Sequence, residues 1–306
     1  MFNLKKYGSE KMSKDEEIFH KVHIAWFPGH MAKTKRLLKE ALKNIDLVVE
    51  VLDARIPYSS SNPDLNQIIE NKPKIIILNK SDLSDPTQNQ KWIKHYEALG
   101  YPCMEFSSKS NKYVPDFKNK VLNIMADKIQ KFKSKGLLGY KIRVMVVGIP
   151  NSGKSSFINK ICGKSKCKVE NRPGVTRQNQ WYSVGDNIEF LDTPGVLWPK
   201  FDDEKVAYNL AFTGAIKDKI LDTEDLAFHF IKSVKERYCQ NICDRFGVDI
   251  SKISELDPWE AIEFIGKKRG FLISGGEIDT LRTSNMILEE FRSGKFGKIS
   301  LESPND

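Results

Sequence analysis

The segment Gly148-Ile-Pro-Asn-Ser-Gly-Lys-Ser155 decides the fold of this chain. An apolar run at 142–147 precedes it, and a helical pattern at 153–162 follows it. Its glycines let the backbone curl so that successive N–H groups face an anion, and the dipole of the following helix favours negative charge there. This strand–loop–helix context predicts a P-loop nucleotide-binding domain.

The side chains of this loop suit a nucleotide phosphate and its metal ion. Lys154 is expected to reach the terminal phosphates, and the hydroxyl of Ser155 is placed to ligate Mg²⁺. The loop residues expected to contact nucleotide are Asn151, Ser152, Gly153, Lys154, Ser155 and Ser156.

Two segments after the loop resemble those with which nucleotide-hydrolysing P-loop proteins sense the terminal phosphate. Asp192 follows an apolar run at 187–191, as expected of a carboxylate that holds Mg²⁺ through water. Gly195 has the backbone freedom to meet the terminal phosphate. Thr176, in the Gly/Pro-containing segment 172–177, would complete the Mg²⁺ shell; a plain surface turn is the alternative.

The segment Asn79-Lys80-Ser81-Asp82 predicts which base is bound. The Asp82 carboxylate can accept two hydrogen bonds from guanine, whereas adenine would leave this charge unpaired, a difference worth a factor of about 10⁴. Lys80 would lie over the base or support the phosphate loop. This segment therefore disfavours an ATP-using P-loop enzyme such as a kinase.

A third segment, Ser107-Ser108, follows the next expected strand and offers donors for the guanine oxygen. The order along the chain is unusual, because the base-reading residues 79–82 precede the phosphate loop. In most GTP-binding domains they follow it. The chain therefore has a circularly permuted order of motifs.

Short apolar runs alternate with helical patterns in the first two thirds of the chain. This alternation predicts an α/β fold with a mostly parallel sheet and helices on both faces. The expected strands are 46–52, 74–78, 101–106, 142–147 and 187–191, and the expected helices are 31–43, 63–71, 86–98, 116–134 and 153–162. After residue 199 the expected elements are all helical, at 203–213, 223–245, 257–268 and 279–292.

These patterns predict a leader at 1–22, a permuted GTPase domain at 23–199, an all-helical domain at 200–300 and a tail at 301–306. Residues 1–200 hold 34 lysines and arginines against 20 acidic residues, whereas residues 201–306 hold 15 against 20. The excess of positive charge in residues 1–200 favours a polyanionic partner such as RNA. An ordinary lysine-rich surface would give the same charge counts.

The composition, 40% hydrophobic and 29% charged, is typical of a soluble globular protein. The longest apolar runs fall short of the ~20 residues that span a bilayer, so no membrane partner is expected. The acidic residues of the leader argue against a targeting peptide, and the five cysteines lack zinc-ribbon spacing. We expect reduced thiols and a cytoplasmic location.

Several longer strings carry a resemblance to the circularly permuted GTPases, and among them to GTPases of ribosome biogenesis. They are Trp26–Met31, Asp53-Ala-Arg-Ile-Pro57, Asp192-Thr-Pro-Gly-Val-Leu-Trp-Pro199, Thr213–Asp218 and Gly266-Lys-Lys-Arg-Gly270. The resemblance covers about residues 23–298. It implies a helical C-terminal domain that contacts RNA, and action in late assembly of the large ribosomal subunit. The implied partners are GTP or GDP and a precursor particle of rRNA and ribosomal proteins, with no role for DNA.

The resemblance also bears on hydrolysis. Val196 stands where many GTPases have a glutamine that orients water, and the family points to His30 as the catalytic side chain instead. Asn151 resembles the asparagine that permits K⁺ binding in related GTPases. A low intrinsic rate, stimulated by the ribosomal particle, and release after hydrolysis are expected. A nucleotide-gated rRNA-binding checkpoint with incidental turnover is the alternative.

Overall fold

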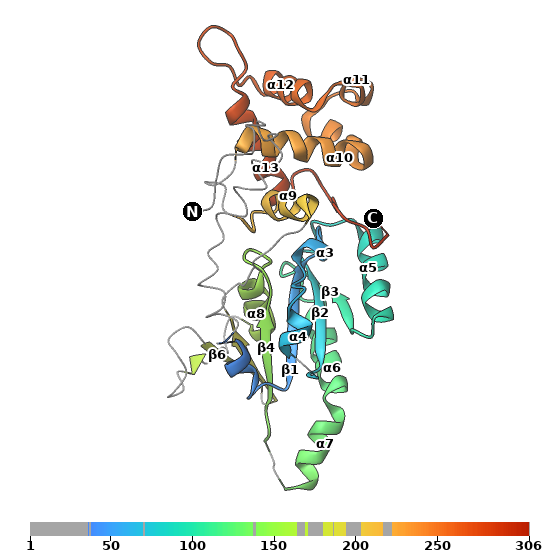
Figure 1. Cartoon of the computed structure of the whole chain (residues 1–306), viewed down its shortest axis with the longest axis vertical. Coiled ribbons are helices and arrows are strands. Elements are labelled where there is room, and N and C mark those ends of the chain that lie inside the picture. Colours follow the sequence, from blue (N-terminus) through green and yellow to red (C-terminus); the bar gives the residue numbers. More distant parts are fainter. Residues whose placement is uncertain are drawn as a thin grey trace, which may run out of the picture.

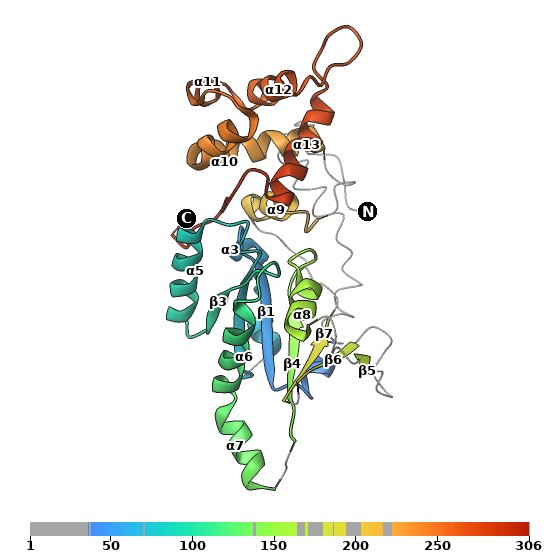
Figure 2. The same cartoon turned by 180° about the vertical axis from the view of Figure 1, so that it is seen from behind.

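The computed structural model of the chain describes residues 36, 38–69, 71–136, 139–163, 169–170, 180–185, 187–193, 203–216 and 222–305. Figure 1 shows these residues as an elongated molecule, with a sheet flanked by helices at one end and a cluster of helices at the other. The same two parts are seen from behind in Figure 2.

A sheet of seven described strands, in the order β3-β2-β1-β4-β7-β6-β5, forms the first part. The strands are β1 (Leu47–Asp53), β2 (Lys74–Asn79), β3 (Cys103–Glu105), β4 (Ile142–Val147), β5 (Val169–Glu170), β6 (Gln180–Val184) and β7 (Ile188–Asp192). β3, β2, β1, β4 and β7 run parallel, and β6 and β5 extend one edge in antiparallel pairs. Because β1 lies between β2 and β4, the ends of β2 and β4 come close together at one edge of the sheet.

Helices cover both faces of this sheet. The helices of this part are α3 (Pro57–Ser60), α4 (Leu65–Ile69), α5 (Pro86–Ala98), α6 (Tyr113–Ile124), α7 (Ala126–Ser134) and α8 (Lys154–Cys162). Side chains of α6 and α8 pack with Val49 and Val51 of β1, whereas α4 packs with Val48 and α5 with Leu52. The alternation of buried apolar residues along β1 thus builds two cores, one on each face.

The second part consists of α9 (Glu204–Phe212), α10 (Thr223–Phe246), α11 (Ile250–Glu255), α12 (Pro258–Arg269) and α13 (Thr280–Ser293). An aspartate caps the first turn of each helix, accepting hydrogen bonds from its free N–H groups. These helices share one apolar core, which also contains Ile56 and Ile149 from the sheet part. The two parts are therefore joined by packed side chains.

The predicted α/β P-loop fold followed by helices is confirmed, and each expected strand appears. The prediction of one helix over 116–134 is wrong: buried Met125, with φ −95° and ψ 6°, separates α6 from α7. Four further elements, β5, β6, α3 and α11, are not predicted from the sequence. Of the helix expected at 31–43, the structure describes residue 36 and the residues from 38 onward, with helix at 36 and 38–42.

The chain returns to the sheet part after α13, and its C-terminus lies beside α5 (Figure 1). The backbone N–H of Ile299 donates to the Leu83 carbonyl at 3.0 Å, and that of Leu301 to the Arg55 carbonyl at 2.8 Å. The buried Glu302 carboxylate then accepts hydrogen bonds from Ser59 of α3 and, at 2.9 Å, from Asn209 of α9. The segment expected as a tail thus holds α3 and α9 together.

Candidate nucleotide-binding site

The phosphate loop follows β4, and its last residue before α8 is Gly153, with φ +89°. A Cβ at Gly153 would meet the side-chain amide of Asn79, and one at Gly148 would meet the carbonyl oxygen of Val51. Both glycines are therefore required by close approach of neighbouring strands as well as by the curl of the loop.

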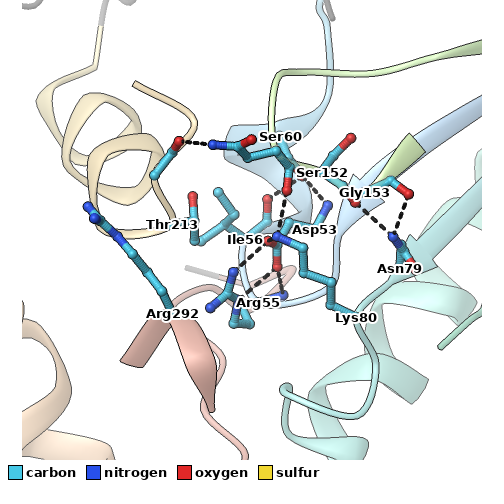
Figure 3. A network of polar contacts seen from close by, with 12 residues as sticks. Asp53, Arg55, Ile56, Ser60, Asn79, Lys80, Ser152, Gly153, Thr213 and Arg292 are labelled. Carbon is cyan, nitrogen blue, oxygen red and sulfur yellow. Dashed lines mark hydrogen bonds and ion pairs between the residues drawn. The ribbon is translucent and has the colours of Figure 1, made fainter. Parts of the chain in front are cut away.

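Residues 79–82, which are predicted to bind the base, are hydrogen-bonded directly to this loop (Figure 3). The Asn79 amide, at the end of β2, donates to the carbonyl of Ser152 at 2.8 Å, and Nζ of Lys80 donates to that of Asn151 at 2.5 Å. Lys80 has a φ of +60°, a left-handed conformation that turns the chain away from β2 at this point. Two motifs far apart in sequence thus form one site, because β2 and β4 flank the same strand.

The Asp82 carboxylate lies beside the segment that follows β3. The Ser107 hydroxyl donates to its Oδ1 at 2.7 Å, and Nζ of Lys109 lies 2.7 Å from its Oδ2. Partial burial raises the pKa of Asp82, but the bonds from Lys109 and Ser107 outweigh burial, so that the pKa lies below its ordinary value. Asp82 is therefore an ionised acceptor near neutral pH. Ser108 follows in the same turn, and the N–H of Ser81 bonds the Phe106 carbonyl.

On the phosphate side, Nζ of Lys154 donates to the Ile149 carbonyl at 2.7 Å within the loop itself. Burial lowers the pKa of Lys154 to about 8, against the opposing effect of Asp192. Burial raises the pKa of Asp192, which Lys154 and a hydrogen bond from Ser155 partly offset. The loop lysine, the Ser155 hydroxyl and this carboxylate are therefore neighbours.

These groups fit Mg²⁺ in the way nucleotide enzymes bind it. Mg²⁺ prefers oxygen ligands and is held by one or two protein oxygens together with phosphate oxygens and water. Ser155 and Asp192 supply such oxygens. Within the described residues, no group of three or more His, Cys, Asp or Glu side chains could hold a metal ion by itself.

The remaining predicted site residues divide into two groups. Ser156 lies exposed in the first turn of α8. His30, Thr176 and Gly195 lie outside the described residues.

Sequence reasoning missed two sets of contacts at this site, of which the first reaches the helical part. The Asn151 amide donates to the carbonyl of Gly214, just after α9, at 2.5 Å. Asp53, at the end of β1, accepts from Lys80 at 2.9 Å and from Arg55 at 2.8 Å (Figure 3). The string 53–57 carries part of the family resemblance, but its spacing does not predict these partners.

In the part of the chain that the structure describes, no helix combines the length and the apolar character needed to cross a membrane.

Comparison with known proteins agrees with this geometry. Residues 143–255 match the family described as 50S ribosome-binding GTPase. That match begins in β4 and so excludes residues 79–82, which precede the loop in this chain. The chain is 43% identical to ribosome biogenesis GTPase A of Bacillus pumilus over 281 residues, covering 92% of this chain and 99% of the relative.

Solved structures show the same likeness. GNP-bound YlqF from T. maritima matches with a TM-score of 0.61 at 29% identity, covering 90% of this chain and 99% of that one. GDP-bound YlqF matches with a TM-score of 0.61 at 28% identity, covering 88% and 99%. Both YlqF structures are thus similar to this chain over nearly their whole length.

Proposed function

The chain belongs to the ribosome biogenesis GTPase A family, and on that basis we propose that it hydrolyses GTP to assist late assembly of the large ribosomal subunit. In this proposal it binds the precursor particle in its GTP state and leaves after hydrolysis. The observation that carries the proposal is the pair of bonds on the phosphate loop: Asn79 reaches it from the base-reading segment, and Asn151 extends from it to the helical part.

Guanine recognition is assigned to the end of β2 and the segment after β3. Asp82, whose pKa is held low, accepts from the ring N–H and the amine of guanine. Lys80 lies against the phosphate loop, where its stem can cover the base. The segment with Ser107 and Ser108 adjoins Asp82 and offers donors to the guanine oxygen.

Phosphate binding is assigned to the loop and to the start of α8. The ammonium of Lys154 exchanges the Ile149 carbonyl for phosphate oxygens, which also favours its charged form. Ser155 would hold Mg²⁺ directly, Asp192 would hold it through water, and Thr176 would complete the shell. The ion would supply positive charge against the phosphate charge that builds up during hydrolysis. Gly195 contacts the terminal phosphate and senses its loss.

Hydrolysis is assigned to His30, because Val196 can neither donate nor accept a hydrogen bond to orient the attacking water. Asn151 would hold K⁺, which would supply positive charge near the phosphates, as an arginine finger does in other GTPases. The intrinsic rate is low, and the ribosomal particle stimulates it by seating the segment around His30.

The helical part, residues 200–300, is assigned to contact with rRNA in the cytoplasm. Lys267, Lys268 and Arg269 gather in the last turn of α12, where phosphates can reach them. The hydrogen bond between Asn151 and Gly214 links the phosphate loop directly to these helices. A change at the bound nucleotide can therefore alter how the helices meet the particle.

Sedimentation with ribosomal particles tests this function. We expect co-sedimentation with large-subunit precursors in a non-hydrolysable GTP analogue, and release in GDP. Equal binding in both nucleotides would contradict the proposal. A His30→Ala variant that binds and leaves normally without hydrolysis would instead favour the rRNA-binding checkpoint.

A further inference from the structure

The Asp53 carboxylate is buried at the end of β1, only 1% exposed, and is shared by two cations. Its Oδ2 accepts from Nζ of Lys80 at 2.9 Å and from a guanidinium nitrogen of Arg55 at 2.8 Å. Its Oδ1 accepts from Nε of Arg55 at 2.9 Å. The Arg55 side chain therefore donates two parallel hydrogen bonds to the carboxylate, and the Lys80 side chain donates a third.

Lys80 belongs to the base-reading segment, and its ammonium has one acceptor on each side. One is Asp53, and the other is the Asn151 carbonyl of the phosphate loop, at 2.5 Å. A flexible lysine side chain is fixed by such a pair of acceptors, since each restricts its rotamers. The position of the Asp53 carboxylate therefore decides where Lys80 lies.

Arg55 extends the same chain of contacts into the helical part. It is 1% exposed, although it carries a full charge. Its second terminal nitrogen donates to the carbonyl of Phe291 in α13 at 3.4 Å, and its guanidinium lies 4.8 Å from the centre of the Phe291 ring. Phe291 itself packs in the helical core, 4.7 Å from the ring of Phe230.

Burial of these charges costs free energy of folding unless Asp53, Arg55 and Lys80 are all present. A buried carboxylate is tolerated when charged donors surround it, and removing one partner leaves charge that is poorly compensated. With Arg55 gone, Lys80 would be the remaining cation described at Asp53, and the stronger attraction would draw its ammonium away from the Asn151 carbonyl.

We propose that Arg55 is a positioning residue for the nucleotide site: through Asp53 it holds Lys80 against the phosphate loop, and through Phe291 it makes that position depend on α13. The inference rests on the proposed role of Lys80 in nucleotide binding. Because coupling between sites is reciprocal, bound nucleotide should also stabilise α13 against local opening.

The full-length variants Arg55→Met and Arg55→Lys test this inference. The first removes the charge, and the second keeps the charge but loses the two-pronged geometry. Arg245→Met is the matched control. The Arg245 side chain donates two hydrogen bonds to Glu290 of α13, one of them at 2.8 Å, and both lie within the helical part. The readouts are the Kd for a fluorescent GDP analogue, the Tm without nucleotide, and amide hydrogen exchange of α13 with and without GDP.

We expect Arg55→Met to weaken GDP binding roughly 10-fold or more, the range for a lost charged hydrogen bond, and Arg55→Lys to recover part of it. Arg245→Met should lower the Tm and leave the Kd unchanged. GDP should slow exchange in α13 of the wild type but not of Arg55→Met. An unchanged Kd in folded Arg55→Met, an equal loss in Arg245→Met, or α13 exchange indifferent to GDP in the wild type would overturn the inference.

A Lys80→Ala variant separates this result from failure of the site assignment. If Lys80→Ala binds GDP normally, Lys80 is not a nucleotide contact, and both the assignment and the inference are wrong. If Lys80→Ala binds weakly while Arg55→Met binds normally, the assignment stands and the inference alone is overturned.

Discussion

The side-chain amide of Asn79 lies 2.8 Å from the carbonyl oxygen of Ser152 and donates a hydrogen bond to it, across 73 positions of sequence. Both side chains are buried. The bond joins residues 79–82 to the phosphate loop, so that the segments proposed to bind the base and the phosphates are held together. The two segments thus meet although the base-reading residues precede the phosphate loop along the chain.

Asn79→Ala should weaken GTP and GDP binding to a similar extent. Loss of the amide leaves the Ser152 carbonyl without its partner, a defect of roughly 1–3 kcal/mol, or about 10-fold or more in affinity. Isothermal titration calorimetry with each nucleotide measures the loss of affinity. Asn241→Ala is the control, because the Asn241 amide makes a similar bond of 2.8 Å to Phe296 within the helical part. A fall in affinity with both variants would show general destabilisation instead.

Asp82→Asn should lower GTP affinity while leaving the fold intact, because the carboxylate that accepts from the guanine edge is lost. Xanthosine triphosphate carries a carbonyl in place of the guanine amine, so it should bind the variant better than it binds the wild type. Competition between the two nucleotides measures the switch. Unchanged GTP affinity would place the base elsewhere.

Hydrolysis should run faster in K⁺ than in Na⁺ at matched ionic strength. The smaller Na⁺ would fit the site expected beside Asn151 less well, and the effect should shrink in Asn151→Ala. Phosphate release in each salt measures it. Because the Asn151 amide also bonds Gly214, the variant's binding to ribosomal particles should be recorded alongside. Equal wild-type rates in the two salts would remove the cation from the mechanism.

His30→Ala should keep near-normal GTP affinity and lose hydrolysis by roughly 10²–10⁴, the range for one well-placed acid–base or orienting group. The defect should be clearest with the ribosomal particle present. Single-turnover rates beside GTP affinity and Tm distinguish this from a structural role, in which stability and nucleotide binding would fall together. An unaltered rate would clear His30 of any part in catalysis.

Glu302 should make stability depend on pH. Burial raises its pKa from 4.5 to about 7, although bonds from Ser59, Asn209 and Tyr58 favour the ionised form. Between these values the folded chain binds more protons than the unfolded chain, so this contribution is fully present below pH 4.5 and is lost as pH rises through about 7.

The largest slope expected from this group is about 1.4 kcal/mol per pH unit. Urea unfolding at several pH values, compared with Glu302→Gln, isolates it from other titrating groups. The variant should be less sensitive to pH in this window, whatever its absolute stability. Parallel pH profiles would show that Glu302 is ionised throughout.

Much of the sheet could be read from local pattern. Apolar runs such as 74–78 and 142–147 are buried on both faces of a parallel sheet, which leaves a continuous signal in the sequence. β5 and β6 could not be predicted in this way, because these short antiparallel strands, β5 at the edge of the sheet and β6 beside it, carry no such run. The break at Met125 could not be predicted either, since the helical pattern continues across it and the break lies in the backbone angles of that residue, φ −95° and ψ 6°.

The sequence by itself determined the P-loop, the base-reading segment and their permuted order, because those functions depend on residue types at fixed short spacings. It also determined the succession of strands and helices. Only the tertiary structure decided that Lys80 shares Asp53 with Arg55, that Asn151 bonds Gly214, and that Glu302 returns to α3 and α9. These contacts join residues distant along the chain, and their energies come from burial and charge pairing that exist once the parts have packed.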